Sequence, residues 1–173
     1  MGPVLVLTGG PAVGKSTISR LLAESRERAA VIEVDDVRQF VVSGAAAPWE
    51  GQEGLRQQRL GVENACALAT RFVAEKIEVV ISDVLNPETT ALYRGLLPDC
   101  LVVRLVAAPA EVRRRAGTRP WYLTEEEFAL LHELDRSRPV PADHVLDVTV
   151  LSPAATCLAV NALWAAVRAE PRR

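Results

Sequence analysis

Residues 9–16 read Gly-Gly-Pro-Ala-Val-Gly-Lys-Ser and carry the whole pattern G-x-x-x-x-G-K-[ST]. Glycines in such a loop adopt backbone conformations closed to other residues, so the loop amides can point inward and surround phosphate oxygens. The lysine then reaches the β- and γ-phosphates of a nucleotide, and the serine hydroxyl can bind Mg²⁺. The pattern predicts a site for ATP and Mg²⁺ that consists of Gly9, Gly10, Pro11, Ala12, Val13, Gly14, Lys15, Ser16 and Thr17.

The segments on either side of this loop favour the functional interpretation over a chance glycine-rich turn. Val4–Thr8 is a short apolar run that suits a buried strand. After the loop, Ile18, Leu21 and Leu22 recur at helical spacing. A strand, a glycine loop and a helix in this order form the context in which the motif binds phosphate, and the helix N-terminus adds to the attraction.

Three aspartates follow the second and third apolar runs, at the point where each strand is expected to end: Asp35, Asp36 and Asp83. Ligands of an open parallel sheet bind beyond the carboxyl ends of its strands, so these side chains are expected beside the phosphate loop. We predict that Asp35 accepts the proton of an attacking hydroxyl. We place Asp83 with Ser16 at the metal, directly or through water. The alternative for Asp35 and Asp36 is an N-cap pair for the next helix, and we expect Asp36 to be that cap.

The residue after Asp83 indicates which reaction the site performs. A hydrolytic ATPase often has a glutamate here to activate water, but this chain has Val84. The chain also lacks the N-K-x-D motif that reads guanine. Transfer of a phosphoryl group to an organic hydroxyl is therefore favoured over transfer to water.

An arginine-rich segment follows the fourth apolar run, with Arg113, Arg114, Arg115 and Arg119. Arginine is suited to hold the equatorial oxygens over which phosphoryl transfer spreads its charge. Successive helical residues lie about 100° apart, so at most two of the first three can face the site. The alternative is a solvated basic helix face. Gly117 and Pro120 are conformational breaks, and we predict a lid over ATP from residue 110 to about residue 122.

Two further residues have an open interpretation. Trp49 lies in a Gly-, Ala- and Pro-rich segment, Ser43–Gly54, which is expected to be the longest loop. Its indole could stack on a substrate or anchor the loop. His132 lies in a helical segment with Phe128 and Leu131, where a packed or surface histidine is expected rather than a catalytic one.

The order of the apolar runs predicts the fold class. Five short runs suit strands and are separated by helical patterns: Val4–Thr8, Val31–Val34, Val79–Ser82, Leu101–Val106 and Val145–Val150. Continuous apolar strands that alternate with helices indicate an α/β fold, with a parallel sheet covered by helices on both faces. Helix starts are signalled at Thr124, which forms a capping box with Glu127, and at Ser152 before Pro153. The 173 residues suit a single domain over residues 1–173.

The composition gives no sign of a strongly charged partner, although local basic patches remain possible. Twenty basic and 22 acidic residues give a net charge of −2, which provides no global attraction to nucleic acid or to an anionic membrane. No apolar run reaches the length of a membrane span, and no signal peptide opens the chain. The three cysteines are widely spaced and suit buried thiols in a reducing compartment, so a cytoplasmic location is expected.

With these residues placed, the chain resembles small P-loop kinases of the group that contains chloramphenicol phosphotransferase and the kinase domain of polynucleotide kinase. Residues 9–17 and the segment from Val34 to Gln39, Val-Asp-Asp-Val-Arg-Gln, carry the first two matches. The third is Val79–Glu88, Val-Val-Ile-Ser-Asp-Val-Leu-Asn-Pro-Glu, and the fourth is the segment from Glu111 to Arg119. The resemblance covers most of residues 3–150. The loop motif is common to many nucleotide-binding proteins, so the second and third matches discriminate.

The resemblance implies a five-stranded parallel sheet in the order 2-3-1-4-5 with a mobile lid. It makes Asp35 the general base and Arg38 a contact to a substrate phosphate, as in polynucleotide kinases. It also places Asp83 and Asn86 among the residues that meet the substrate. The lid arginine of the group aligns best with Arg115, and Arg119 is the second choice; both are predicted to be catalytic.

These observations favour an ATP-dependent kinase that phosphorylates a hydroxyl of a small molecule, such as a natural product, a nucleoside or a sugar-like acceptor. One alternative is a 5′-hydroxyl polynucleotide kinase, which Arg38 and the Asn86-Pro87-Glu88 stretch support. A second alternative, from another class, is an ATPase or switch with no organic acceptor. The pocket beside Asp35 discriminates the first two: a closed apolar pocket fits a small molecule, and an open basic channel fits a nucleic-acid end.

Overall fold

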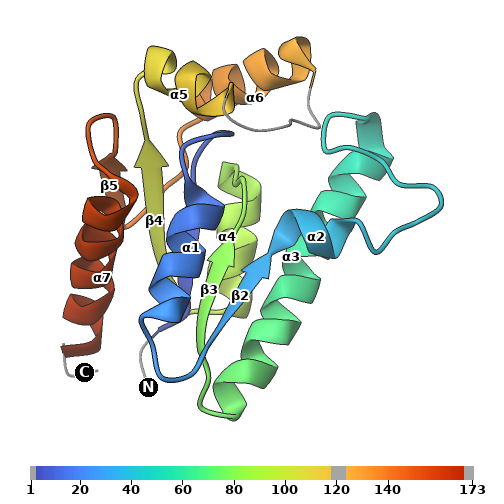
Figure 1. Cartoon of the computed structure of the whole chain (residues 1–173). Helices are drawn as coiled ribbons and strands as arrows, with labels where there is room; N and C mark the ends of the chain where they lie inside the picture. Colours follow the sequence, from blue (N-terminus) through green and yellow to red (C-terminus); the bar gives the residue numbers. More distant parts are fainter. Residues whose placement is uncertain (1–2, 118–123, 170–173) are drawn as a thin grey trace.

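The structure, a computed structural model, describes residues 3–117 and 124–169 (Figure 1). Its centre is a parallel sheet of five strands in the order β2-β3-β1-β4-β5. The strands are β1 (Leu5–Thr8), β2 (Ala29–Glu33), β3 (Glu78–Ser82), β4 (Leu101–Val106) and β5 (His144–Asp147). Leu5 of β1 lies opposite Val80 of β3 on one side and Leu101 of β4 on the other. The predicted α/β class and strand order are therefore confirmed, and the architecture is that of a P-loop nucleotide-binding protein.

Seven helices are described in residues 3–117 and 124–169. They are α1 (Lys15–Glu24), α2 (Val34–Arg38), α3 (Gly51–Ala74), α4 (Pro87–Leu96), α5 (Pro109–Ala116), α6 (Glu125–Ser137) and α7 (Pro153–Ala169). One face of the sheet packs against α3 and α4, and the other against α1 and α7. Helices α5 and α6 lie together beyond the end of β4, at the top of Figure 1. Helices therefore cover both faces of the sheet. The carboxyl ends of the strands lie at the edge of the sheet where ligands of such folds bind.

The strand side chains alternate between two apolar clusters. In β1, Val6 joins the cluster with α3 and α4, whereas Leu5 and Leu7 join the cluster with α1 and α7; all three are fully buried. Burial on both sides explains the uninterrupted apolar run of β1, which is typical of a strand in a covered parallel sheet.

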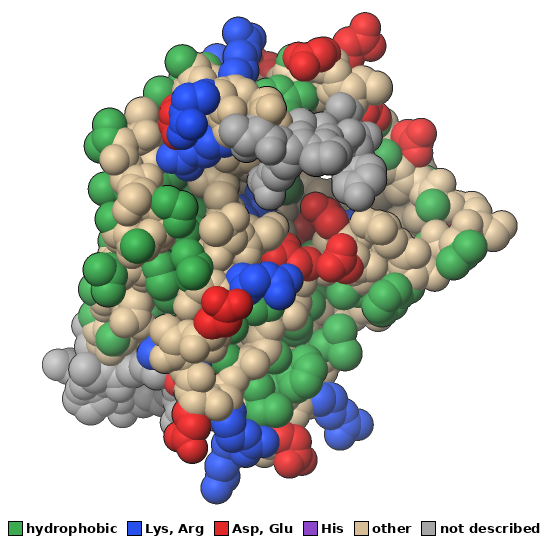
Figure 2. Space-filling model, in the orientation of Figure 1, with side chains coloured by type: hydrophobic (Ala, Val, Ile, Leu, Met, Phe, Trp, Pro, Cys, Tyr) green, Lys and Arg blue, Asp and Glu red, His purple; other side chains and the backbone are tan. Residues whose placement is uncertain are grey.

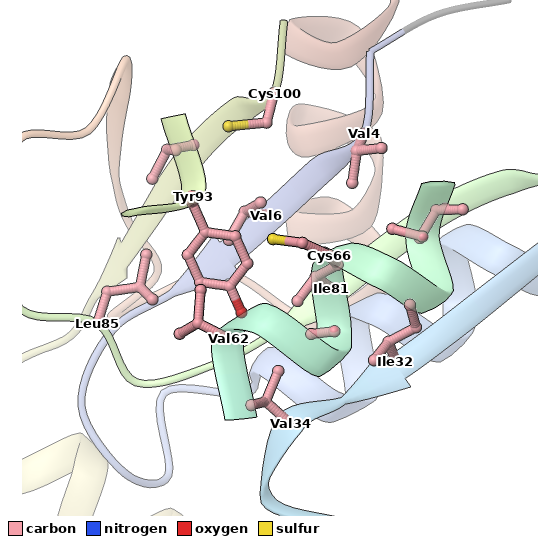
Figure 3. Close-up of a cluster of buried hydrophobic side chains, with 14 of the residues drawn as sticks. Val4, Val6, Ile32, Val34, Val62, Cys66, Ile81, Leu85, Tyr93 and Cys100 are labelled. Atoms are coloured by element: carbon pink, nitrogen blue, oxygen red, sulfur yellow. The ribbon is translucent and has the colours of Figure 1, made fainter. Parts of the chain in front are cut away.

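The apolar cluster between the sheet and helices α3 and α4 contains the hydroxyl group of Tyr93, which bonds to Asp83. Figure 3 shows the Tyr93 ring among Val6, Val62 and Leu85. Tyr93 is fully buried, and its hydroxyl donates a hydrogen bond to Asp83 Oδ2 at 3.0 Å. The apolar packing around the ring therefore fixes a hydrogen-bond donor at the end of β3.

Most predicted helix starts are confirmed by their caps. Thr124 and Glu127 exchange the two hydrogen bonds of a capping box, and Ser152 Oγ accepts from the amide of Ala155 at 3.1 Å. The prediction for Asp36 is wrong. Strand β2 ends at Glu33, which is the N-cap of α2, so Asp35 and Asp36 lie in the first turn of that helix. Carboxylates in the first turn of a helix interact favourably with the helix dipole, as an N-cap carboxylate does. An acidic pair near a helix start therefore gives the same sequence signal in either position.

The last strand is shorter than its apolar pattern. Val148 and Val150 continue the pattern, but β5 ends at Asp147. The side chain of Asp147 accepts hydrogen bonds from the amide and the hydroxyl of Thr149, at 2.8 and 2.6 Å. These local bonds turn the chain away from the sheet, as aspartate and threonine often do.

Two findings bear on the environment of the chain. Within the described ranges, no helix has the length and apolar character needed to cross a membrane. Cys66, Cys100 and Cys157 are free thiols; the first two are buried and the third is half-buried.

Candidate active site

The phosphate loop connects β1 to α1, and two of its glycines have positive φ angles that favour this residue type. Gly9 and Gly14 have φ angles of 137° and 107°, a region that side chains rarely adopt. A Cβ atom on Gly9 would lie 2.2 Å from the carbonyl oxygen of Leu105, so β4 packs directly on the loop backbone. The loop is therefore held in shape by its contact with the neighbouring strand.

The Lys15 ammonium is held at this loop. Its Nζ atom donates hydrogen bonds to the carbonyl oxygens of Gly9 and Gly10, at 2.9 and 3.1 Å. Burial lowers the pKa of Lys15, while the nearby carboxylates of Asp35, Asp83, Glu33 and Asp135 act to raise it. The group is thus a fixed cation between the loop and a cluster of acids.

Ser16, the predicted metal ligand, faces an acid that the sequence analysis missed. Its Oγ donates to Glu33 Oε2 at 3.2 Å, and Glu33 is the last residue of β2. Burial raises the pKa of Glu33, and hydrogen bonds from Ser82 and Ser16 oppose that shift. The signal that could have identified Glu33 is its position at the carboxyl end of a strand, where ligands of a parallel sheet bind.

Three predicted residues meet in one hydrogen-bonded chain. Arg38 Nη1 lies 2.6 Å from Asp35 Oδ1, and Arg38 Nη2 lies 2.7 Å from Asp83 Oδ1. The Asp35 side chain is 71% exposed, whereas that of Asp83 is fully buried. Arg38 therefore connects an open carboxylate on α2 to a closed one at the end of β3.

The environment of Asp83 differs from that of an open metal ligand. Its Oδ1 also accepts from the amide of Val84 at 2.8 Å, and its Oδ2 accepts from Tyr93. Burial raises the pKa of Asp83, against the opposing charge of Arg38. Both carboxylate oxygens are thus engaged by protein donors.

Asn86 lies at the start of α4. Its side chain accepts from the amide of Thr89 at 2.8 Å and completes a capping box. Its Nδ2 donates to Gln58 Oε1 at 3.3 Å. Asn86 therefore reaches the pocket through Gln58, which lines it.

A pocket of about 400 Å³ joins the loop to Asp35. Its charged lining residues are Lys15, Glu33, Asp35 and Arg38, and Ser16 of α1 lies among them. The rest of the lining is uncharged: Gln39, Pro48, Trp49, Gln58, Ser82, Val84 and Leu131, with Pro11, Ala12 and Gly14 of the loop. Figure 2 shows acidic side chains gathered beside the hollow in this face of the molecule. Trp49 thus faces the pocket from the segment between α2 and α3.

A second pocket, of about 740 Å³, lies on the other side of the loop. Gly14, Thr17 and Ile18 line it together with α5 and the segment that connects β5 to α7. The loop and the start of α1 separate the two pockets. A ligand held by the loop amides could therefore extend into both.

Arg115, the predicted lid arginine, belongs to this second pocket. Its guanidinium donates to the carbonyl oxygens of Val13 and Val148, at 3.1 and 2.8 Å, and to Glu111 Oε1 at 2.7 Å. Hydrogen bonds from Arg114 and Arg115 lower the pKa of Glu111 to about 2. Arg119 and the C-terminal part of the predicted lid fall in residues 118–123, outside the described residues.

His132 contacts the phosphate loop. A Cβ atom on Gly10 would lie 2.7 Å from His132 Cε1, so the imidazole packs directly on the loop backbone. Burial lowers the pKa of His132, while Asp135 and the backbone of Pro11 act to raise it. The sequence analysis expected a packed or surface histidine; nothing in the local pattern marks its contact with a loop more than 100 residues away.

Comparisons with known proteins support the fold. No family model matches the sequence, and a search of curated proteins found no match. Solved structures do match. A sugar kinase from Janibacter sp. HTCC2649 is 14% identical, with a TM-score of 0.66 and 96% of each chain covered. Shikimate kinase from Bacteroides thetaiotaomicron is 16% identical, with a TM-score of 0.68, 94% of this chain and 98% of that chain covered. Shikimate kinase from Acinetobacter baumannii, in complex with shikimate, is 20% identical, with a TM-score of 0.62 and coverage of 97% and 96%.

Proposed function

We propose that this chain is an ATP-dependent kinase that transfers the γ-phosphoryl group to a hydroxyl of a small molecule. One observation carries the proposal: an exposed carboxylate, Asp35, shares a pocket with the phosphate loop and Lys15. A base and a γ-phosphate on the two sides of one pocket can act on the same acceptor oxygen. The names of the structural neighbours, which include sugar and shikimate kinases, agree with this reaction.

The proposed reaction is a direct transfer. The acceptor oxygen attacks the γ-phosphorus, and its proton passes to Asp35 as the new P–O bond forms. The bond between the γ-phosphorus and the β–γ bridging oxygen breaks, and ADP leaves. Lys15 neutralises charge on the β- and γ-phosphates during this step, as P-loop lysines do. The second pocket, beside Thr17 and Arg115, would hold the nucleoside.

We propose that Ser16 and Glu33 hold the magnesium ion. A hydroxyl and a carboxylate 3.2 Å apart beside the loop are oxygen ligands of the kind Mg²⁺ prefers. When bound, the ion would neutralise phosphate charge. Asp83 is engaged by Arg38, Val84 and Tyr93, so we assign it to positioning Arg38, and through Arg38 the base Asp35.

Replacement of Glu33 by glutamine is expected to raise the Mg²⁺ concentration for half-maximal activity by about tenfold or more, because an amide is a weaker magnesium ligand. Titration of turnover and of nucleotide binding with Mg²⁺ measures the change. Glu24→Gln, an exposed acid at the end of α1, is the matched control. Equal Mg²⁺ dependence of the two variants would contradict the assignment.

Replacement of Arg115 by alanine is expected to lower turnover by about 10²-fold while ATP binding weakens less, because its contact would strengthen in the transition state. Steady-state kinetics and direct ATP binding separate the two effects. The neighbour Arg114 lines the same pocket, but its side chain is 68% exposed and bonds Glu111, so Arg114→Ala is the control for loss of an arginine at this helix. If both variants lose turnover equally, Arg115 has no special role. Arg119→Ala tests the second predicted arginine in the same assay.

A polynucleotide 5′-hydroxyl kinase is the second candidate, because Arg38 stands in the acceptor pocket beside Asp35. The group that the sequence resembles contains both polynucleotide kinase and a small-molecule kinase, chloramphenicol phosphotransferase, so the resemblance does not decide between the two candidates. The salt dependence of acceptor binding distinguishes a polynucleotide kinase from a small-molecule kinase. Binding to a nucleic-acid end weakens as ionic strength rises, whereas binding of a small uncharged acceptor does not. Efficient phosphorylation of 5′-hydroxyl oligonucleotides, lost in Arg38→Ala, would favour the polynucleotide kinase.

The proposed function is tested by following ADP release and transfer of label from γ-labelled ATP to a panel of hydroxyl compounds. Acceptor-dependent ADP release and a labelled product are expected. ADP release that is unaffected by any acceptor, with water as the only acceptor, would instead identify an ATPase or switch.

A further inference from the structure

We infer that the acceptor carries no carboxylate or phosphate group: the pocket is built for an uncharged hydroxyl compound with a flat apolar face. This inference rests on the proposed function, because it concerns the acceptor side of the same pocket. It also distinguishes this chain from the shikimate kinase of Acinetobacter baumannii, whose solved complex holds a carboxylate compound.

The charged side chains around the pocket give its acceptor side a net negative charge. Its lining contains two cations, Lys15 and Arg38, and two carboxylates, Glu33 and Asp35. The buried carboxylate of Asp83 lies directly behind Arg38. Lys15 is bound to the phosphate loop and faces the phosphates of the nucleotide. The acceptor side is therefore net negative among the described residues.

The positive charge of Arg38 does not make the acceptor side of the pocket attractive to an anion. Its guanidinium lies 2.6 Å from one carboxylate and 2.7 Å from another, and only 17% of its side chain is exposed. A single positive charge is thus shared by two negative ones before an acceptor enters. An anionic acceptor would have to compete with Asp35 and Asp83 for Arg38 while being repelled by both, and juxtaposed like charges are strongly unfavourable.

The uncharged lining indicates what the pocket accepts instead. Trp49 and Pro48 form one wall, and Leu131 of α6 and Val84 add apolar surface. Gln39 and Gln58 supply amide groups that both donate and accept hydrogen bonds. An indole packs well against an aromatic ring or the apolar face of a sugar ring. These groups suit a neutral ring compound that presents a hydroxyl to Asp35.

The sign of the potential in the pocket can be measured without a known acceptor. The chain contains three tryptophans, Trp49, Trp121 and Trp164. Trp164 is fully buried, so a Trp121→Phe variant leaves Trp49 as the tryptophan that quenchers reach. Caesium, iodide and acrylamide then compare a cation, an anion and a neutral quencher at constant ionic strength.

Caesium, normalised to acrylamide, is expected to quench Trp49 at least about twofold more strongly than iodide, because a negative pocket concentrates cations. Asp35→Asn and Glu33→Gln should bring the two ions close to parity. Glu50→Gln, beside Trp49 but outside the pocket lining, is the matched control and should preserve most of the difference. Quenching by iodide that equals or exceeds quenching by caesium would overturn the inference.

Matched acceptors test the same inference through activity. Each hydroxy acid is compared with its methyl ester, for example shikimate and methyl shikimate, so that the negative charge is removed and one methyl group is added. The ester is expected to have a kcat/KM at least about tenfold higher than the acid. An acid that is phosphorylated as well as its ester overturns the inference but leaves the kinase proposal intact. If no hydroxyl compound is phosphorylated, the kinase proposal fails and the quenching ratio still decides the charge of the pocket.

Discussion

Replacement of Lys15 by alanine is expected to reduce phosphoryl transfer by about 10³-fold or more while the chain stays folded. The reason is the position of its ammonium, which binds the carbonyl oxygens of Gly9 and Gly10 and so lies where the β- and γ-phosphates are proposed to bind. Loss of one fixed charge in such a site costs about 10²–10³-fold, and a P-loop lysine contacts two phosphates.

The side chain of Lys15 contributes no apolar surface to either core cluster, so the thermal midpoint of unfolding should change little. Turnover, ATP binding and thermal unfolding of the same preparation separate catalysis from folding. Lys76→Ala replaces an exposed lysine after the end of α3 and is the matched control, since the chain has two lysines. A folded Lys15→Ala protein with normal turnover would refute the kinase proposal.

Replacement of Asp35 by asparagine is expected to lower turnover by about 10²-fold or more, the scale of a lost general base. Asparagine keeps an oxygen that can accept from Arg38 Nη1, so the geometry of α2 should survive. ATP affinity should change little, because Asp35 is proposed to face the acceptor and the loop is proposed to hold the nucleotide. Measurement of kcat together with the Kd for ATP distinguishes these effects.

Asp36 provides the control for this substitution. It is exposed, neighbours Asp35 in the first turn of α2 and does not line the pocket. Asp36→Asn should therefore leave turnover within a few-fold of the unmodified protein. If Asp36→Asn is the more damaging change, the two roles have been assigned in reverse.

The sequence predicts the phosphate loop well because every group it needs lies within nine consecutive residues. It also predicts the meeting of Asp35 and Asp83, since parallel strands bring their carboxyl ends to one edge of the sheet. The Arg38 bridge between these aspartates has no local signal; only the family resemblance pointed to Arg38. The structure adds that this arginine is held by both carboxylates.

The missed features depend on contacts between distant segments. Glu33 was overlooked because its contact with Ser16 joins β2 to α1 across the loop. His132 reaches Gly10 only because α6 lies over the ends of the strands. The cap at Asp36 was misplaced because strand β2 ends at Glu33, two residues before the aspartate pair, whereas the predicted strand continued to Val34.

The proposed base, Asp35, and the Trp49 side of the proposed acceptor pocket are anchored to different parts of the protein. Asp35 is connected through Arg38 and Asp83 to Tyr93, whose ring lies within the core of the sheet. The segment that carries Trp49 is instead tied to α3, where Gln57 bonds the amide of Ala46 and the carbonyl of Gly44. Because residues 43–50 are held by α3 and not by the chain from Tyr93 to Asp35, substitutions in this segment are expected to change the range of acceptors and to leave the proposed phosphoryl-transfer residues in place. The segment is therefore a suitable starting point for directed evolution of the acceptor range.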